Sequence, residues 1–463
     1  MCVSKFSLEG RSLLAQDRWQ SAWGSDWRAW VAFVVLFVLL IPVFLVNAAG
    51  TAKPETFHSW ERSSESLVLA KIESDRTSRA VDSYGLLRAQ PDWNSPYSTI
   101  DSPTVGSDGA KDYRSYLSQL GLTGYLYSAL YQYTPCSSLT CLHLVSSVLF
   151  SLLLVFLVFL LGLITRRSFA VAFLLSMVAS PWIVTMGRNL YWSPWLWLLP
   201  VCAAALFVLA RKRSRRIAAL ALVFGAFILR FASGYEFITS MSLMAVAVPV
   251  LAFIFQDDFS RGPLIRAAKD ALGVFAASLA AFVAVLLVHT SARGAGSISE
   301  GIRLVWQGDV LRRTYGSAED FTDAYSASLN AGPLSILRKY LFEWKTDFMT
   351  IGSGAPFSIS FGPLSLWILI SICLLIVAFR FAAHDRLWVR DLALLVVTAL
   401  IPVSWYVLGK SHSYIHTHIN FVLWYLFFAG ALIFVVYDYL VTRGLTVRIA
   451  DSLRLGSRVH GTK

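Results

Sequence analysis

A series of long apolar runs constrains this chain more than any other feature of its sequence. A helix needs about 20 mostly apolar residues to cross the hydrocarbon core of a bilayer. We expect about ten such helices, and hence an all-α polytopic membrane protein. Their predicted ranges are 29–48, 141–165, 168–186, 190–210, 217–233, 237–256, 271–290, 362–381, 391–409 and 420–440.

The composition supports this class. Hydrophobic residues make up 56% of the chain and charged residues 15%, whereas soluble domains average about 25% charged residues. The formal net charge of +12 does not indicate a nucleic-acid partner, because the Lys and Arg residues form short clusters at the ends of apolar runs. Such clusters are typical of contacts with anionic lipid headgroups, so membrane lipids are expected partners. The first run is longer than the apolar region of a signal peptide, so we expect it to be retained.

Basic residues also predict the orientation of the chain. If the N-terminus is cytoplasmic, the predicted inside segments carry 22 Lys and Arg residues. The short outside connections then carry only Arg188, Arg230 and Lys410. Because short cytoplasmic segments are enriched in Lys and Arg, both termini are predicted to be cytoplasmic. The chain then divides into a cytoplasmic segment, 1–28, a transmembrane domain, 29–440, and a basic cytoplasmic tail, 441–463.

Two long segments, 49–140 and 291–361, are predicted to lie outside. Structureless loops of this length are usually functional or disordered. These two contain helix-like stretches at 63–78 and 335–349, which we expect to lie along the membrane surface. The first segment leads into the sequence CSSLTC at 136–141, whose two cysteines fit either a short disulfide or two unpaired thiols.

The acidic cluster after the first predicted span is the main candidate for catalysis. Glu61 and Glu65 lie four residues apart, so both carboxylates share one face of the predicted helix. A carboxylate held just outside the bilayer is able to take the proton of an acceptor hydroxyl. We rank Glu65 first, Glu61 second and Asp75 third as the catalytic carboxylate.

A structural role is the alternative for this cluster. Ser63 or Ser64 is positioned to cap the predicted helix. Arg62 and Lys71 are available to pair with the two carboxylates on a solvated helix face. The sequence does not decide between this interpretation and catalysis.

Three cations are unusual because the predicted orientation disfavours them. Arg188 lies in a tight outer turn, Arg230 lies within an apolar run, and Lys410 opens the last outer turn. A guanidinium offers a fork of N–H donors that fits a phosphate, and an ionisable residue within a span is usually functional. We therefore predict that at least one of the three binds a phosphate. Tyr235 and Glu236 complete this candidate binding set, although Glu236 alternatively pairs with Arg230.

The last outer turn carries three histidines, His412, His416 and His418, directly after Lys410. His412 and His416 are four residues apart, which places them on one face if this turn is helical. This spacing suits a metal cation, a phosphate or other part of a substrate, or ordinary structural hydrogen bonds. No HExxH motif occurs. We predict substrate contacts here and no cofactor, with a divalent cation as the alternative.

The topology and the acidic cluster together resemble the C-type (GT-C) glycosyltransferase superfamily. Its members are membrane enzymes that use polyprenyl-phosphate-linked sugars. They share a cytoplasmic N-terminus, a large first outer loop and an acidic motif early in that loop. Many carry Asp-Glu before an amphipathic helix, where this chain has Ser64-Glu65 within the stretch 60–72. The resemblance implies a GT-C-like fold, with Glu65 at the position of the acidic motif.

The expected function is transfer of a sugar from a polyprenyl-phosphate donor to a glycan, lipid or protein acceptor on the outer face, with a carboxylate as general base. The alternatives are an O-antigen-type polymerase or ligase, a transporter or flippase of lipid-linked glycans, and a non-enzymatic assembly factor. The chain has no internal repeat and its predicted span centres are almost purely apolar, which disfavours a transporter. The lack of an outside Asn-x-Ser/Thr acceptor favours a bacterial inner membrane.

Overall fold

The structure, a computed structural model, describes residues 27–77, 81, 83–101, 112–256, 259–342 and 363–459, of which 363–365 and 445–459 are described by their backbone alone. Within these residues the chain is nearly all-α. The described strands form one two-stranded antiparallel sheet, β1 (Leu87–Gln90) with β2 (Asp112–Ser115). Each strand is only four residues long, so its sequence shows no pattern from which this sheet could be expected.

Among the described residues, four helices are each long and apolar enough to cross a membrane: α2 (Trp27–Val46), α7 (Leu139–Ile164), α13 (Arg261–Arg293) and α19 (Leu387–Leu408). A fifth span forms if Thr417–Tyr425 and Phe428–Gly444, bent by 42°, cross together. The other bundle helices are α8 (Arg167–Val178), α10 (Trp195–Leu209), α11 (Arg213–Ala232), α12 (Ile238–Ile254) and α18 (Pro363–Ala382). These helices support a polytopic α-helical membrane protein, while the number of ten spans stays a prediction.

The predicted span at 168–186 is broken in two. It contains α8 and then α9 (Pro181–Met186). Pro181 has no backbone N–H with which to continue the first helix. Ser180 instead caps the second helix, because its hydroxyl accepts from the Ile183 N–H at 3.2 Å. The expectation of one continuous helix here was wrong.

The predicted span at 420–440 is broken as well. The chain first forms α21 (Thr417–Asn420) and η4 (Phe421–Tyr425), and only then α22 (Phe428–Val459). Phe427, between η4 and α22, has a φ of 74°, which no helix of L-residues continues through. A single helix over this range was therefore also a wrong expectation.

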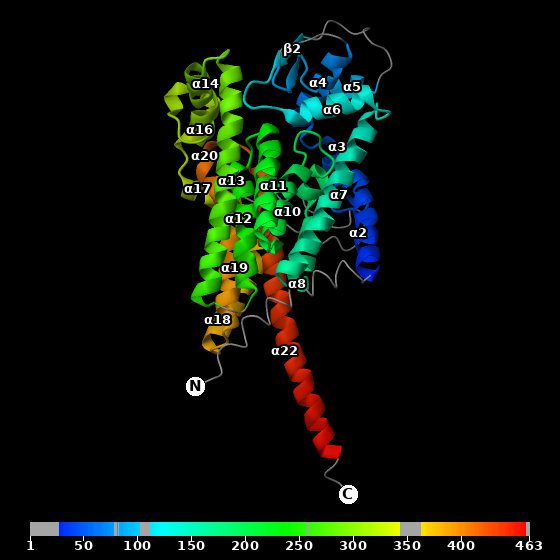
Figure 1. Cartoon of the computed structure of the whole chain (residues 1–463), viewed down its shortest axis with the longest axis vertical. Helices are drawn as coiled ribbons and strands as arrows, with labels where there is room; N and C mark the ends of the chain where they lie inside the picture. Colours follow the sequence, from blue (N-terminus) through cyan, green and yellow to red (C-terminus); the bar gives the residue numbers. More distant parts are fainter. Residues whose placement is uncertain are drawn as a thin grey trace.

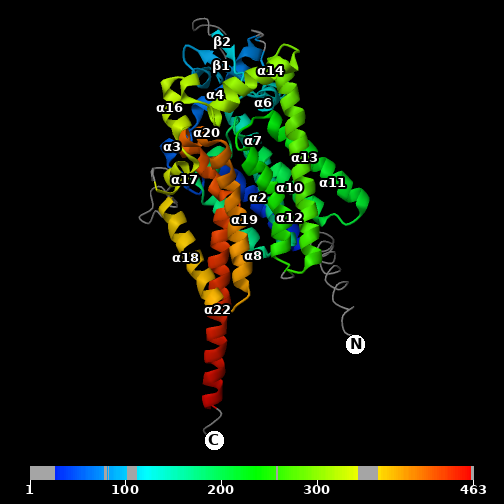
Figure 2. The same ribbon diagram turned by 90° about the vertical axis from the view of Figure 1, so that its left-hand side faces the viewer.

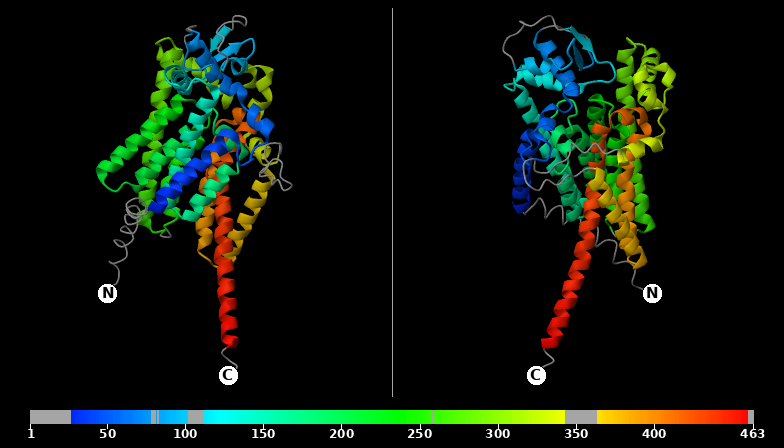
Figure 3. Two further views of the ribbon diagram at one scale, coloured as in Figure 1. Left: turned by 90° about the vertical axis from the view of Figure 1, so that its right-hand side faces the viewer. Right: turned by 180° about the vertical axis from the view of Figure 1, so that it is seen from behind.

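The described parts of both long segments predicted outside fold into short elements at one end of the bundle, while α22 extends from the opposite end (Figure 1; Figure 2 and Figure 3 show the same from other sides). The helix-like stretches predicted at 63–78 and 335–349 correspond to α4 and α17, although 78 and 343–349 lie outside the described residues. The first segment contains α3 (Pro54–Ser59), α4 (Arg62–Arg76), α5 (Pro96–Thr99), α6 (Leu122–Tyr133) and the sheet. The second contains α14 (Ile298–Val305), η1 (Trp306–Val310), α15 (Leu311–Arg313), η2 (Ala318–Asp320), α16 (Asp323–Asn330) and α17 (Pro333–Phe342).

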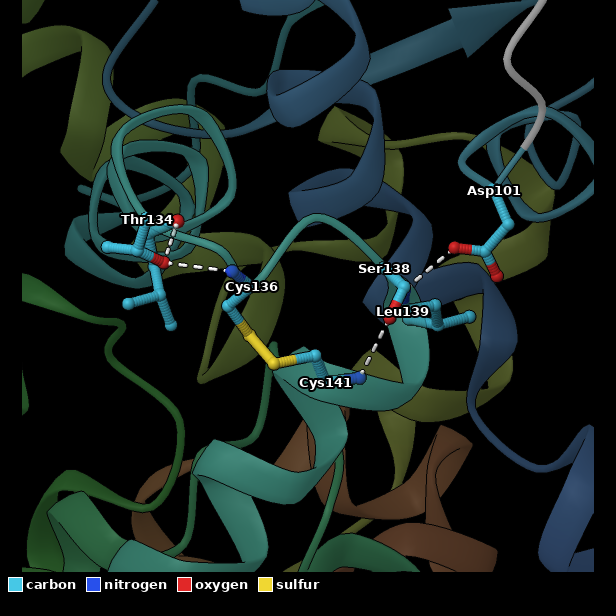
Figure 4. Close-up of a disulfide and its surroundings, with 7 residues drawn as sticks. Asp101, Thr134, Cys136, Ser138, Leu139 and Cys141 are labelled. Atoms are coloured by element: carbon cyan, nitrogen blue, oxygen red, sulfur yellow. Dashed lines mark hydrogen bonds between the residues drawn. A yellow bond between two sulfur atoms is a disulfide. The ribbon is translucent and has the colours of Figure 1, made fainter.

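A disulfide fixes the entry of the chain into α7. Cys136 and Cys141 are bonded across the link between α6 and α7 (Figure 4). Ser138 caps α7 by accepting from the Cys141 N–H at 3.2 Å, and the Leu139 N–H donates to Asp101 Oδ1 at 2.8 Å. The first turns of α7 are thereby held against the first outer segment.

Near the end of α18 and the start of α19, charged side chains form with one residue of α22 what we call the Arg–Asp cluster: Arg380, Arg390, Asp391 and Asp438. Arg390 Nη2 lies 2.8 Å from Asp391 Oδ1 and 2.5 Å from Asp438 Oδ2. Arg380 pairs with Asp391 and, at 3.1 Å, with Asp438. The cluster joins α18, α19 and α22, and Arg166 before α8 adds a contact to Asp438 at 3.3 Å.

Candidate active site

Glu65 lies in the first turn of α4, close to the start of the first outer segment. α4 begins after Glu61, which takes the N-cap position with a left-handed φ of 59°. The expectation that Ser63 or Ser64 caps this helix was wrong, because both lie inside its first turn, and the Ser64 hydroxyl donates to the Glu61 carboxylate at 2.6 Å. Glu65 is only 4% exposed, so it does not belong to a solvated helix face.

Three donors from three other segments hold the Glu65 carboxylate. Oε1 accepts from the Leu190 N–H at 2.7 Å and lies 3.0 Å from His143 Nε2. Oε2 accepts from the hydroxyl of Tyr97. His143 belongs to α7, Tyr97 to α5, and Leu190 to the loop between α9 and α10. Glu65 therefore connects the first outer segment to the ends of the bundle helices.

The environment of Glu65 favours its ionised form. Burial on its own would raise the pKa of Glu65, but the neighbouring His143 and the hydrogen bonds from His143, Tyr97 and Leu190 outweigh that effect and hold the pKa below its usual range. Burial and the nearby carboxylate raise the pKa of Tyr97. At neutral pH Glu65 is therefore an anion, and Tyr97 is a protonated donor beside it.

A cavity of about 20 Å³ lies beside the Glu65 carboxylate. A space of this size holds about one water-sized group, so it admits a hydroxyl but not a sugar ring. Its wall is built from aromatic, basic and hydrogen-bonding side chains of the first outer segment, α7, α9 and the loop that follows α9. The lining residues are Phe57, His58, Trp60, Arg62, Glu65, Tyr97, His143, Thr185, Arg188 and Asn189.

The other two ranked carboxylates have different surroundings. Glu61 Oε1 lies 3.5 Å from His418 Nε2, so Glu61 links the first outer segment to the last outer turn. Asp75 pairs with Lys71 at 2.5 Å and accepts from Ser128 Oγ at 2.6 Å. Of the three carboxylates ranked from the sequence, Glu65 is the one that lines the cavity.

Arg188 is the predicted phosphate-binding cation that reaches this cavity. Its Nη2 donates to the Phe57 carbonyl at 2.9 Å, and its guanidinium lies 4.0 Å from the centre of the Phe57 ring. Burial lowers the pKa of Arg188, while the charge of Glu65 acts in the opposite direction. Arg188 thus anchors the segment 54–59 and contributes positive charge to the cavity wall.

The other two predicted cations lie away from the cavity and donate to backbone carbonyls. Arg230 donates to Gly234 O at 3.0 Å and to Glu236 O at 2.5 Å, so its contact with Glu236 is through the backbone and not through the carboxylate. Lys410 Nζ donates to two carbonyls of the second outer segment, at 2.5 and 2.9 Å, those of Leu329 and Ala331. These bonds stabilise outer turns, and phosphate binding by the two cations stays a prediction.

Glu236 is the centre of a second buried polar group. Its Oε1 accepts from the Tyr191 hydroxyl at 3.0 Å, and the Gln119 amide lies 2.8 Å away with its nitrogen as donor. Arg313 Nη1, from α15, lies 3.7 Å from the same oxygen. Tyr235, which precedes Glu236 in the chain, is buried, and its ring lies against those of Phe282 and His289. Because Tyr191 follows Leu190, the loop between α9 and α10 contacts Glu65 on one side and Glu236 on the other.

The three histidines of the last outer turn lie together. The ring centres of His412 and His416 are 4.5 Å apart, and those of His416 and His418 are 5.8 Å apart. Burial and then the charge of His418 lower the pKa of His416 to about 4. Burial, His416 and Arg313 hold the pKa of His412 well below its usual value. Among the described residues, no group of three or more His, Cys, Asp and Glu side chains is arranged to hold a metal ion.

Sequence reasoning missed three side chains of these polar groups: Tyr97, His143 and Arg313. Tyr97 and Arg313 lie in the long outer segments, where no periodic pattern points to them. His143 is a single histidine near the start of a long apolar run. The available signal for His143 was that ionisable residues within predicted spans are usually functional.

Comparison with known proteins adds no relative from which a role transfers. No family model matches this chain, and no curated protein or solved structure matches it either.

Proposed function

We propose that this chain is a membrane glycosyltransferase that moves a sugar from a polyprenyl-phosphate donor to an acceptor hydroxyl, with Glu65 at the reaction centre. One observation carries the proposal: Glu65 is a buried, ionised carboxylate beside a cavity with room for one hydroxyl group. One lining residue, His143, lies near the start of α7, so the cavity borders the end of an apolar helix long enough to cross a membrane. A lipid-linked donor keeps its chain in the bilayer and its phosphate at the interface, so a site at the helix ends suits it.

In the proposed reaction, the acceptor oxygen attacks C1 of the sugar. The bond between C1 and the phosphate oxygen breaks, and the phosphate leaves with the bonding electrons. The acceptor proton passes to the Glu65 carboxylate. Because the pKa of Glu65 lies below its usual range, the carboxylate is a weak base towards a free hydroxyl. The proton therefore moves while the new C–O bond forms, when the hydroxyl is most acidic.

The neighbours of Glu65 have positioning roles in this proposal. The Leu190 N–H and His143 fix Oε1, which leaves Oε2, bonded to Tyr97, as the oxygen that turns towards the acceptor. Arg188 adds positive charge on the cavity wall, where negative charge develops on the leaving phosphate. The proposed acceptor is a glycan, lipid or protein on the outer face of a bacterial inner membrane.

The proposal is tested with purified protein and a set of labelled polyprenyl-phosphate sugars. Release of free polyprenyl phosphate is measured by thin-layer chromatography, with water as acceptor, so the natural acceptor need not be known. Release by the unmodified protein and its loss in Glu65→Gln support the proposal. Equal release by both proteins contradicts it.

The same assay separates the alternative functions. A polymerase or ligase consumes diphosphate-linked glycans, so these donors are included in parallel. A flippase carries a donor across liposomes and leaves the bond between sugar and phosphate intact. Transport without release therefore contradicts the transferase proposal.

A further inference from the structure

Arg313 differs from the other outer arginines in what its guanidinium contacts. Its side chain is 15% exposed and lies 3.7 Å from Glu236 Oε1, beyond hydrogen-bond distance. It makes no hydrogen bond within the part of the chain that the structure describes, whereas Arg188 and Arg230 donate to carbonyls at 2.9 and 3.0 Å. The planar fork of Arg313 donors is therefore available to a ligand.

The nearest carboxylates to Arg313 are shared with other arginines. Arg312 and Arg293 share Asp309, at 3.3 and 3.8 Å. Arg313 lies 3.7 Å from Glu236 Oε1, and Arg230 donates to the backbone carbonyl of the same residue. Arg313 therefore has a charge partner in Glu236, but its guanidinium donors are not bonded to that carboxylate.

The last outer turn contributes further unpaired groups. α15, which ends at Arg313, packs against α20 (Lys410–Ile415), and the charge of Arg313 reaches both His412 and His416. Trp405 is 4% exposed, its ring centre lies 5.8 Å from that of His412, and its Nε1 donor has no hydrogen-bond partner among the described residues. His416 Nδ1 is likewise unpartnered there. An indole N–H is a donor only, so it suits a ligand rich in acceptor oxygens.

One acceptor in the same turn also lacks a partner. Asn420 is fully buried, its Nδ2 donates to Ser413 Oγ at 3.3 Å, and its Oδ1 has no hydrogen-bond partner in the described chain. A carbonyl oxygen of this kind is satisfied by a hydroxyl group. The region therefore offers several N–H donors, the guanidinium of Arg313 among them, and one site for a hydroxyl.

We propose that Arg313, together with His416 and Trp405, forms a binding site for a phosphate group on a ligand that also carries hydroxyl groups. Phosphate matches the guanidinium fork in shape and is opposite to it in charge. The site lies across the α9–α10 loop from Glu65, because that loop contacts both Glu65 and the Glu236 that Arg313 faces. The inference rests on the proposed function in one respect: if the chain is the proposed glycosyltransferase, the phosphate belongs to the lipid-linked donor.

The test is direct binding, measured by isothermal titration calorimetry on the purified full chain without any transfer reaction. Inorganic phosphate and farnesyl phosphate are the probes, and farnesol controls for partition of the lipid chain into detergent. We expect Arg313→Gln to weaken binding of the phosphate probes by about tenfold or more, because a charge-assisted bidentate contact is lost. Arg313→Lys should weaken binding less than Arg313→Gln, since it keeps the charge without the fork.

Arg312→Gln is the matched control. It removes the same charge from the neighbouring residue, but Arg312 already pairs with Asp309 and contacts Tyr325. We expect Arg312→Gln to weaken binding of the phosphate probes by less than about threefold, because the lost charge acts on the ligand only from a distance and is screened by salt. Monodisperse elution and an unchanged melting temperature qualify each variant as folded.

The outcomes are distinct. Tighter binding of farnesyl phosphate than of inorganic phosphate, lost in Arg313→Gln, supports the site and identifies a lipid source. Equal binding of both, lost in the same variant, supports the site with free phosphate as its source. Absence of binding to the unmodified protein, unchanged binding in Arg313→Gln, or an equal loss in Arg312→Gln overturns it. Phosphate binding at Arg313 without any sugar transfer would contradict the proposed function alone.

Discussion

The Glu65 site and the Arg–Asp cluster are both buried charged groups, yet they differ in how their charges are matched. In the Arg–Asp cluster, Arg380 and Arg390 face Asp391 and Asp438, so permanent charges cancel in pairs. At Glu65 the partners are a phenol, an imidazole and a backbone N–H. Such partners stabilise a carboxylate through hydrogen bonds, without the fixed opposite charge of an arginine.

The two regions also differ in the space beside them. Glu65 borders a cavity of about 20 Å³, whereas the Arg–Asp cluster ties α18, α19 and α22 through direct contacts. Charges that are paired in this way link the helices that carry them. An ionised carboxylate beside a cavity has a free direction of approach. The difference separates a group suited to stability from one suited to chemistry.

The predicted orientation places the Glu65 site and the Arg–Asp cluster on opposite faces of the membrane. We expect a cysteine at Ser299, exposed in α14, to react with an impermeant maleimide in intact cells. A cysteine at His384, exposed near the Arg–Asp cluster, should react only after permeabilisation. The effect is all-or-none. The background is low, because Cys202 and Cys373 are buried, and Cys2 is replaced by serine in both variants.

Reaction of both cysteines from the same side would place the two regions on one face and contradict the predicted orientation. The two cysteines of the disulfide do not interfere, because they carry no free thiol.

The next largest effect concerns Glu65 itself. Replacing it with Gln keeps the shape of the side chain and removes the proposed base, so we expect turnover to fall by about 10²–10⁴-fold. Donor binding should survive. The same change at Glu61 should be milder, because Glu61 contacts Ser64 and His418 and does not line the cavity. Steady-state release of polyprenyl phosphate measures both. A larger loss in Glu61→Gln than in Glu65→Gln would reverse the ranking.

For the Arg–Asp cluster the expected effect is on stability. Asp391→Asn leaves Arg380 and Arg390 with fewer carboxylates, and removing one partner of a buried pair typically costs about 3–5 kcal/mol. Unfolding in SDS monitored by circular dichroism gives this value, while turnover per folded protein should be unchanged. Asp385→Asn is the control, since Asp385 is 35% exposed and 3.7 Å from Arg380, so its loss should cost at most about 1 kcal/mol. A stable Asp391→Asn protein with impaired turnover would remove the distinction between the two regions.

The two regions were not equally predictable from the sequence. Glu65 is recognisable as a candidate because it follows the first apolar run and lies at the start of a predicted helix. The Arg–Asp cluster was missed, since Asp391 and Asp438 lie far apart in the chain and each looks like an isolated charge near an apolar run. Pairing between distant helices depends on how the bundle packs, which periodicity does not report.

The same limit explains the partners of the candidate residues. Arg188, Arg230 and Lys410 were recognised as unusual cations, but their carbonyl partners are set by turn geometry. His143 and Tyr97 were missed, because only the folded chain brings α5 and α7 to Glu65. The helical class of the protein could be predicted from the apolar runs. The breaks at Pro181 and Phe427 could not, because each lies inside an apolar run that shows no interruption in hydrophobicity.

The smallest expected effect concerns the pH dependence of stability at the last outer turn. The pKa of His416 is lowered to about 4 in the folded chain, first by burial and then by His418, against an ordinary value of 6.5. Between pH 6.5 and 4 the unfolded chain therefore binds a proton at His416 that the folded chain does not, so stability falls as the pH falls through this window. His412 acts in the same direction. The Glu65 carboxylate, whose pKa is lowered, loses its contribution to the stability of the fold only below its ordinary pKa of 4.5.

We expect the melting temperature to drop between pH 7 and pH 5, and to drop less in His416→Gln. Glu65→Gln should leave the change in melting temperature between pH 7 and pH 5 as it is in the unmodified protein. An identical dependence of the melting temperature on pH in His416→Gln and in the unmodified protein would show that His416 is not the group that titrates in this range.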